Sequence, residues 1–175
     1  IRCEYNKQFG FPFESEFWRG IEYIDKTFNV DSLKDEKMAF QAGIGLAKFH
    51  LICSDLDSSK LKTNIKNFHN TKHYIEQYIM SLDDYSFSKL GYQVKDRVQC
   101  LVNSLSYHIK FADFLFMSLK KISIDHNVIH GDPKLSNFLF DIKSKSVVSL
   151  IDLDTVYSGY LLTDLADCIR SVCNL

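Results

Sequence analysis

The sequence has neither an excess of one charge nor a long apolar segment. Its 21 basic and 22 acidic side chains leave a formal charge of −1 and are spread along the chain, so no field of one sign would attract nucleic acid or an anionic membrane. No apolar run reaches the roughly 20 residues that span a bilayer, and no basic segment followed by an apolar one opens the chain. We therefore expect a soluble, cytoplasmic protein that binds a small molecule, with no nucleic-acid or membrane partner.

Cysteine shows no pairing pattern. The cysteines are odd in number, widely scattered and without a C-x-x-C motif: Cys3, Cys53, Cys100, Cys168 and Cys173. This disfavours both a disulfide framework and a zinc site. We interpret them as reduced thiols.

The composition favours a folded domain. A chain of 175 residues that is 46% apolar and 14% aromatic can bury a substantial core. The first residue is Ile1 rather than methionine, and Leu175 falls inside a helical pattern with no glycine or proline after it. We expect a piece of a longer protein.

The first two-thirds of the chain is predicted to be mainly helical. Bulky and β-branched residues predict a strand over 17–24. An arrangement Ser32-x-x-Asp35 resembles a helix cap, and apolar residues at three- and four-residue spacing predict a helix from there to Ile52. A second helix is predicted to start near Thr71, and a third, long and central to an α-rich domain, covers 94–119.

Short strands follow the long helix. We predict them at 127–129, 137–140 and 147–151, the last two forming a hairpin through the polar turn 141–146. Thr163 can cap a final helix. In that helix we expect Leu165, Ala166, Ile169 and Val172 to face inward, while Asp164, Asp167 and Arg170 share another face.

The most informative residues surround this hairpin. The run His130-Gly131-Asp132 is followed by Asn137, and Asp152 comes fifteen residues later. A loop before the hairpin and the ends of its two strands would bring Asp132, Asn137 and Asp152 to one place. Three oxygen-bearing side chains in one pocket suit a hard cation such as Mg²⁺, together with a carboxylate that orients an attacking hydroxyl. For each residue alone, turn formation is the better explanation, but the ordered set favours a functional site.

This spacing resembles the H-G-D-x-x-x-x-N and I-D motifs of the aminoglycoside phosphotransferase and choline kinase-like families, which are relatives of protein kinases. Further residues look like the bacterial N-acetylhexosamine 1-kinases, from about residue 17 to residue 171: Trp18-Arg19, Tyr23-Ile24, Asn67 to Thr71, Ile151 to Val156, Gly159, and Asp164-x-x-Asp167-x-Ile169-Arg170. The resemblance implies an α+β fold, with residues 1–24 as the end of an N-terminal lobe and hinge. Residues 25–175 would form a mostly helical C-terminal lobe with a small antiparallel hairpin.

The resemblance also implies roles in an ATP- and Mg²⁺-dependent transfer of phosphate to a hydroxyl. Asp132 would orient the acceptor hydroxyl, and Asn137 and Asp152 would bind Mg²⁺. His130 would brace the loop of this catalytic motif rather than transfer protons. Lys134 would either approach the transferred phosphate or remain solvated.

The remaining candidate residues are less constrained by the motif. Asp154 would be a supplementary metal ligand or a cap of the following turn. Asp164 would brace the catalytic loop, and Arg170 would reach the substrate. Backbone groups of Glu22, Tyr23 and Ile24 would meet the adenine of ATP. Trp18 is more readily a core residue than a ligand contact, and the roles of His69 and Asn70 stay open.

The sequence lacks two parts of a complete kinase. It has no G-x-G-x-x-G loop to cover the phosphates and no recognisable strand lysine. We therefore expect this chain alone to bind ATP weakly and to turn over poorly or not at all. The alternatives that remain open are another acceptor (an aminoglycoside, choline, homoserine or thiamine) and an inert pseudokinase-like binding module.

Overall fold

The computed structural model describes residues 4–5, 8–9, 11–13, 16–18, 20–33, 35–61, 65–84, 91–122 and 124–173. The helices in these ranges are α1 (Glu36–Ile52), α2 (Thr71–Asp84), α3 (Tyr92–Ile122) and α4 (Leu161–Val172). The strands are β1 (Glu4–Tyr5), β2 (Gln8–Phe9), β3 (Phe11–Phe13), β4 (Glu16–Trp18), β5 (Thr27–Phe28), β6 (Asn127–Ile129), β7 (Phe138–Asp141), β8 (Val147–Leu150) and β9 (Tyr157–Gly159). Short 3₁₀ turns are η1 (Ser58–Lys60), η3 (Leu135–Asn137) and η4 (Leu153–Thr155). The chain is thus α+β, with small antiparallel sheets, as predicted.

The predicted hairpin is present. Strands β7 and β8 pair antiparallel, with Phe138 opposite Leu150, and the register shifts between Leu139 and Phe140. Strand β5 adds to the other edge of β7, giving the sheet order β5-β7-β8. A separate pair joins β6 to β9. The sequence analysis missed both β5 and β9, because strands of two and three residues carry too little alternation to recognise.

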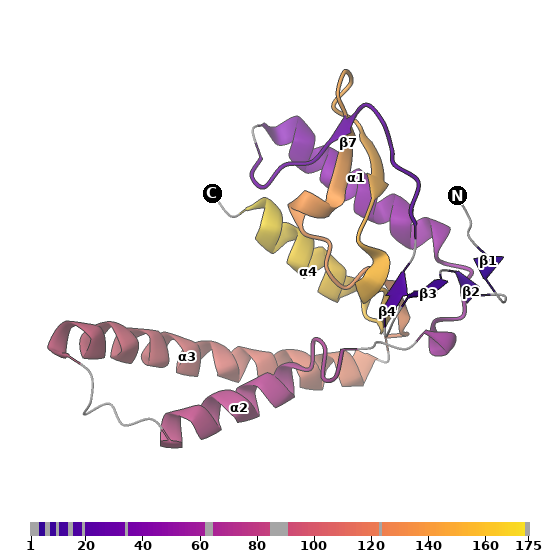
Figure 1. Ribbon diagram of the computed structural model, residues 1–175. Helices are drawn as coiled ribbons and strands as arrows, with labels where there is room; N and C mark the ends of the chain where they lie inside the picture. The colour runs from indigo at the N-terminus through magenta and orange to yellow at the C-terminus, as the bar shows by residue number, and fades with distance from the viewer. Residues whose placement is uncertain are drawn as a thin grey trace.

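The core lies between α1 and the three-stranded sheet (Figure 1). Met38, Ala42 and Leu46 recur every four residues and bury one face of α1, as its apolar period predicts. They pack with Phe138 and Phe140, which are fully buried on β7. This core holds the hairpin, and therefore the loop before it, in a defined position.

The start of α1 differs from the prediction. The N-cap is Asp35, whose carboxylate accepts a 2.9 Å hydrogen bond from the backbone N–H of Met38. Ser32 lies three residues earlier, outside the helix. The Ser32-x-x-Asp35 pattern therefore marked the correct region but the wrong capping residue, since Asp and Ser cap helices equally well.

Helix α4 also begins earlier than predicted. Tyr160 occupies the N-cap position, and Thr163 lies within the first turn rather than capping the helix. The predicted inward face is wrong in part. Asp164 and Cys168 are the buried residues, whereas Leu165 and Ile169 are about half exposed. A buried carboxylate at Asp164 was not expected from polarity, and its hydrogen bonds, described below, explain how it is accommodated.

The long helix α3 was predicted to be central, and it is not. Helices α2 and α3 extend away from the sheet, α1 and α4 (Figure 1). Most of the described apolar side chains along α3 are exposed, including Leu101 at 63% and Phe114 at 70%. A helical period in the sequence shows that one face of a helix is apolar. It does not show which other element packs against that face. No helix in the described part of the chain, α3 included, is both long and apolar enough to cross a membrane.

The strand predicted over 17–24 is shorter in the structure. Strand β4 ends at Trp18, and residues 20–24 belong to no strand. Ile21 and Tyr23 are strongly exposed, so these large side chains do not form part of a packed surface. The side chain of Trp18 and all of Arg19 lie outside the described residues, as does Cys3.

Candidate active site

The loop after β6 brings Asp132 and Asn137 together. The η3 turn places Asn137 at the entrance to β7, with its backbone N–H 2.9 Å from the carbonyl oxygen of Lys134. The side-chain Nδ2 of Asn137 then donates to the backbone carbonyl of Asp132 at 2.8 Å and lies 3.3 Å from its Oδ2. Because Nδ2 is engaged in this way, the amide oxygen of Asn137 is the atom left to accept a donor or a cation.

Asp152 approaches the same loop from the far end of the hairpin. The backbone N–H of Ile151 donates to the carbonyl of Asn137 at 2.9 Å, which ties the two motifs together. Asp152 itself has φ 64° and ψ 57°, in the left-handed region, and its side chain is exposed. Asp tolerates this conformation better than most residues, and such backbone geometry is concentrated at functional sites. The turn directs the chain away from β8 immediately after Ile151.

The side chain of His130 contacts both of these segments. The imidazole is completely buried and packs edge-on against Phe49 at 5.4 Å between ring centroids. Its Nε2 lies 2.9 Å from the carbonyl oxygen of Ile151, and its Nδ1 accepts from the backbone N–H of Asp132 at 3.3 Å. These partners require a proton on Nε2 and none on Nδ1, so the ring is neutral. The hydroxyl of Thr155 also donates to the His130 carbonyl at 2.9 Å.

A buried carboxylate holds the backbone of this loop. Asp164 of α4 accepts hydrogen bonds from the N–H groups of His130 at 2.7 Å and Gly131 at 2.8 Å. His50 of α1 reaches across to the same carboxylate, with Nε2 2.8 Å from Oδ2. Asp164 thereby braces the loop, which agrees with the role that the motif implied.

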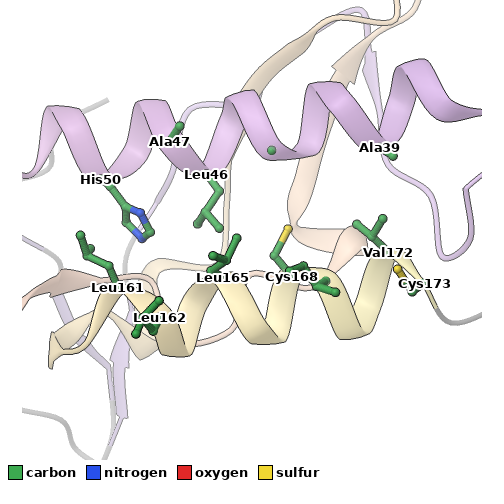
Figure 2. Close-up of a pocket in the computed structure, with 12 residues that line it drawn as sticks. Ala39, Leu46, Ala47, His50, Leu161, Leu162, Leu165, Cys168, Val172 and Cys173 are labelled. Atoms are coloured by element: carbon green, nitrogen blue, oxygen red, sulfur yellow. The ribbon is translucent and has the colours of Figure 1, made fainter. Parts of the chain in front are cut away.

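His50 lies at one end of an apolar groove between α1 and α4 (Figure 2). The groove encloses about 290 Å³ and is lined by short and aliphatic side chains such as Leu46, Leu165 and Cys168. His50 was not among the predicted site residues. A signal was available, because His50 continues the four-residue series of Met38, Ala42 and Leu46 on the buried face of α1.

Lys134 pairs with Asp132 in this structure. Its ammonium donates a short hydrogen bond to Oδ2 of Asp132, and both side chains are partly exposed. This hydrogen bond raises the pKa of Lys134, and partial burial opposes the rise. The negative charges of Asp132, Asp152 and Asp167 also favour the charged lysine. Lys134 is thus neither simply solvated nor remote from Asp152.

A pocket of about 580 Å³ adjoins the loop. Phe68, His69, Tyr157, Asp167 and Arg170 form part of its wall. A Cβ atom added to Gly131 would lie 3.1 Å from the ring of Phe68 and 3.2 Å from that of Tyr157, so the aromatic wall directly abuts the loop.

The charged groups of this pocket are paired with each other. Nε of Arg170 donates to Asp167 at 2.8 Å, and the Arg170 side chain is well exposed. Arg170 lines this pocket, and the expectation that it reaches a substrate stays a prediction. Phe68 and Tyr157 were not predicted to line a site, because nothing local distinguishes them from other aromatic residues in the chain.

The remaining predicted residues are Asp154 and the segment from Glu22 to Ile24. Asp154 is exposed within the η4 turn, two residues beyond Asp152. Glu22 and Tyr23 are exposed, and the carbonyl of Ile24 accepts a 2.7 Å hydrogen bond from Thr27.

Asn137 and Asp152 suit a cation whose remaining ligands come from phosphates and water. Within the described ranges, no three His, Cys, Asp or Glu side chains converge as a complete metal site. The amide oxygen of Asn137 and the carboxylate of Asp152 together provide two hard oxygen donors. Mg²⁺ is commonly held by one or two side chains, with phosphates and water completing its shell, so the chemistry of these two donors fits Mg²⁺.

A carboxylate, an amide and a lysine on one loop, with a second carboxylate at the end of a hairpin, form an arrangement suited to phosphoryl transfer. A family model described as "Phosphotransferase enzyme family" matches residues 17–174. The chain belongs to this family, and the match confirms the phosphotransferase resemblance of its motifs. Membership indicates a phosphotransferase enzyme with a kinase-like fold.

Proposed function

We propose that this chain is the helical lobe of an ATP- and Mg²⁺-dependent kinase that transfers phosphate to a hydroxyl group of a small neutral acceptor. The observation that carries this proposal is the link between the two motifs. Asn137 donates to the carbonyl of Asp132 with its side chain and accepts from Ile151 with its carbonyl. One residue thereby ties the predicted base to the turn that presents Asp152.

The reaction assigns a separate task to each residue. Bound ATP would supply the phosphoryl group, and Mg²⁺ would offset the negative charge of its phosphates. Asp132 orients the acceptor hydroxyl and takes its proton as the oxygen bonds to phosphorus and the bond to ADP breaks. Asn137 and Asp152 would hold the cation through their oxygens. Lys134 belongs to the same loop as Asp132, and its ammonium, now paired with Asp132, would turn toward an incoming phosphate.

The pocket beside Gly131 is the proposed acceptor site. Its aromatic wall suits the apolar face of a ring, and its Asp167 is already paired with Arg170. A cationic acceptor such as an aminoglycoside or choline would need acidic groups that are not neutralised in this way. A neutral sugar would use both donors and acceptors, and an N-acetylhexosamine is the first candidate.

We propose that residues 1–24 connect to a smaller lobe, with residues 25–175 forming the helical lobe. The backbone of Glu22, Tyr23 and Ile24 would then meet the adenine edge. A kinase of this type needs a phosphate-covering loop, and no G-x-G-x-x-G motif occurs in these 175 residues. Asp154 remains a candidate additional ligand.

The test is an acceptor screen with the full-length protein that carries this lobe. ADP release is measured with ATP, Mg²⁺ and a panel of amino sugars, neutral sugars and amino alcohols. Asp132→Asn should lower turnover by roughly 10²- to 10⁴-fold, because it removes the proton acceptor. Asp141→Asn, in the hairpin turn, is the matched control and should retain activity. Equal turnover by Asp132→Asn and wild type would contradict the proposal and favour a binding module.

A further inference from the structure

His69 occupies a constrained position in the wall of the pocket. Its backbone has a positive φ of 54°, and Asn67, two residues earlier, has φ 58°. The carbonyl of His69 accepts a 3.0 Å hydrogen bond from the N–H of Thr71, at the start of α2. The imidazole stacks on Phe68 at 4.1 Å between ring centroids. The ring is therefore held from both its backbone and one face.

Tyr157 approaches the imidazole at one nitrogen. Its hydroxyl oxygen lies 3.2 Å from Nδ1 of His69. Burial raises the pKa of Tyr157 to about 12, with the charge of Asp164 contributing, so the phenol keeps its proton at neutral pH. A phenol is a better donor than acceptor, whereas an unprotonated imidazole nitrogen is a strong acceptor. If the phenol donates to Nδ1 of a neutral imidazole, the ring proton resides on Nε2.

His69 forms part of the wall of the pocket, as does Arg170, and the side chain of His69 is partly exposed. Tyr157 contacts the imidazole at Nδ1 rather than at Nε2. With the ring proton on Nε2, the pocket would offer an N–H from His69 and the guanidinium of Arg170, while its carboxylate at Asp167 is engaged.

We propose that His69 determines acceptor specificity: its Nε2–H donates a hydrogen bond to a hydroxyl or carbonyl oxygen of a neutral acceptor, and Tyr157 holds the imidazole in the tautomer that makes this possible. An ammonium group at the same position would face a donor with no lone pair, so cationic acceptors are disfavoured. This inference rests on the proposed acceptor pocket. The inference adds the residue and the atom that discriminate between acceptors, His69 and its Nε2.

The first test determines the tautomer of His69 and does not require enzymatic activity. Long-range ¹H–¹⁵N correlation spectra of the ¹⁵N-labelled chain assign the protonated nitrogen of His69. The inference requires the proton on Nε2 in the wild type and a shift toward mixed tautomers in Tyr157→Phe. A proton on Nδ1 in the wild type would overturn it.

The second test is binding, with N-acetylglucosamine as the neutral probe and choline as the cationic probe. Titration with the neutral probe should perturb the His69 ring resonances, and His69→Phe, which keeps an aromatic ring but has no donor, should weaken its binding by about tenfold. His69→Gln retains an N–H donor and should recover part of the affinity, which a purely structural role of the ring would not produce. His108→Phe, on α3 outside the pocket, is the matched control. Wild-type affinity in His69→Phe, stronger binding of choline than of the sugar, or no sugar binding at all would refute the inference.

Activity separates this inference from the proposed function. Phosphorylation of a sugar by the full-length protein with an unchanged KM in His69→Phe would overturn the role of His69 and leave the kinase proposal intact. Sugar binding that depends on His69, without any phosphate transfer to the sugar, would support the inference and count against the proposed reaction.

Discussion

Oδ2 of Asp164 lies 2.7 Å from the backbone nitrogen of His130, although 34 residues separate them. The same carboxylate binds the N–H of Gly131 through its other oxygen. Helix α4 thus holds the catalytic-motif loop by its backbone, so the position of Asp132 depends on the packing of α4 as well as on local sequence.

Asp164→Ala should destabilise the fold by about 3 kcal/mol or more, because the N–H groups of His130 and Gly131 would remain buried without an acceptor. Denaturant unfolding measures this loss. Asp167→Ala removes the partner of Arg170 on the same helix, at a partly exposed site, and should cost about 1 kcal/mol or less. Similar losses in the two variants would show that the buried hydrogen bonds contribute little.

Two glycines of α1 should respond to alanine in opposite directions. A Cβ at Gly43 meets no atom within 4 Å, so Gly43→Ala should stabilise the protein by about 0.5–1 kcal/mol through helix propensity. A Cβ at Gly45 would lie 2.7 Å from Val147 and 3.1 Å from Phe138. Gly45→Ala should therefore destabilise by about 1–3 kcal/mol through overpacking against the hairpin. Thermal unfolding compares them, and changes of the same sign would contradict the packing of α1 on β8.

The thiol of Cys168 should make stability fall in alkaline solution. Burial raises its pKa from 9.0 to about 11, with the charges of Asp167 and Asp164 adding to the effect. The unfolded thiol loses its proton first, so its contribution to stability is complete below about pH 9 and is lost as pH rises toward 11. The difference in unfolding free energy between wild type and Cys168→Ala should shrink over this range. Cys100→Ala, exposed on α3, serves as the control, and a pH-independent difference for Cys168→Ala would contradict the prediction.

Replacing Lys134 should change how the site binds a cation. The Lys134 ammonium now neutralises Asp132 and interacts with Asp152. In Lys134→Met, Mg²⁺ alone should bind up to about fivefold more tightly, consistent with the roughly 1 kcal/mol upper value of exposed ion pairs. Isothermal titration measures this, with Lys143→Met in the exposed hairpin turn as the control. Unchanged Mg²⁺ affinity would indicate that Lys134 does not compete for the cation site.

Local sequence predicted the parts of the fold that depend on neighbouring residues. The apolar series in α1, the start of α2 at Thr71 and strand β6 at 127–129 are confirmed, because period and turn residues act over a few positions. The hairpin that carries Asn137 was also predicted for this reason. The predicted start of α4 at Thr163 and the predicted central position of α3 were wrong. Residues that are close in space rather than in sequence determine where α4 begins and how much of α3 is buried.

The order and spacing of Asp132, Asn137 and Asp152 in the sequence alone determined the family and the kind of chemistry. The resemblance already implied that His130 and Asp164 brace the loop. Only the tertiary structure decided the contacts by which they do so, from His130 to Ile151 and from Asp164 of α4 to the loop backbone, and only it revealed the aromatic wall beside Gly131. Those contacts join residues 20 or more positions apart, and they form only when α1, α4 and the sheet pack together. A pattern of neighbouring residues does not predict how these elements pack together.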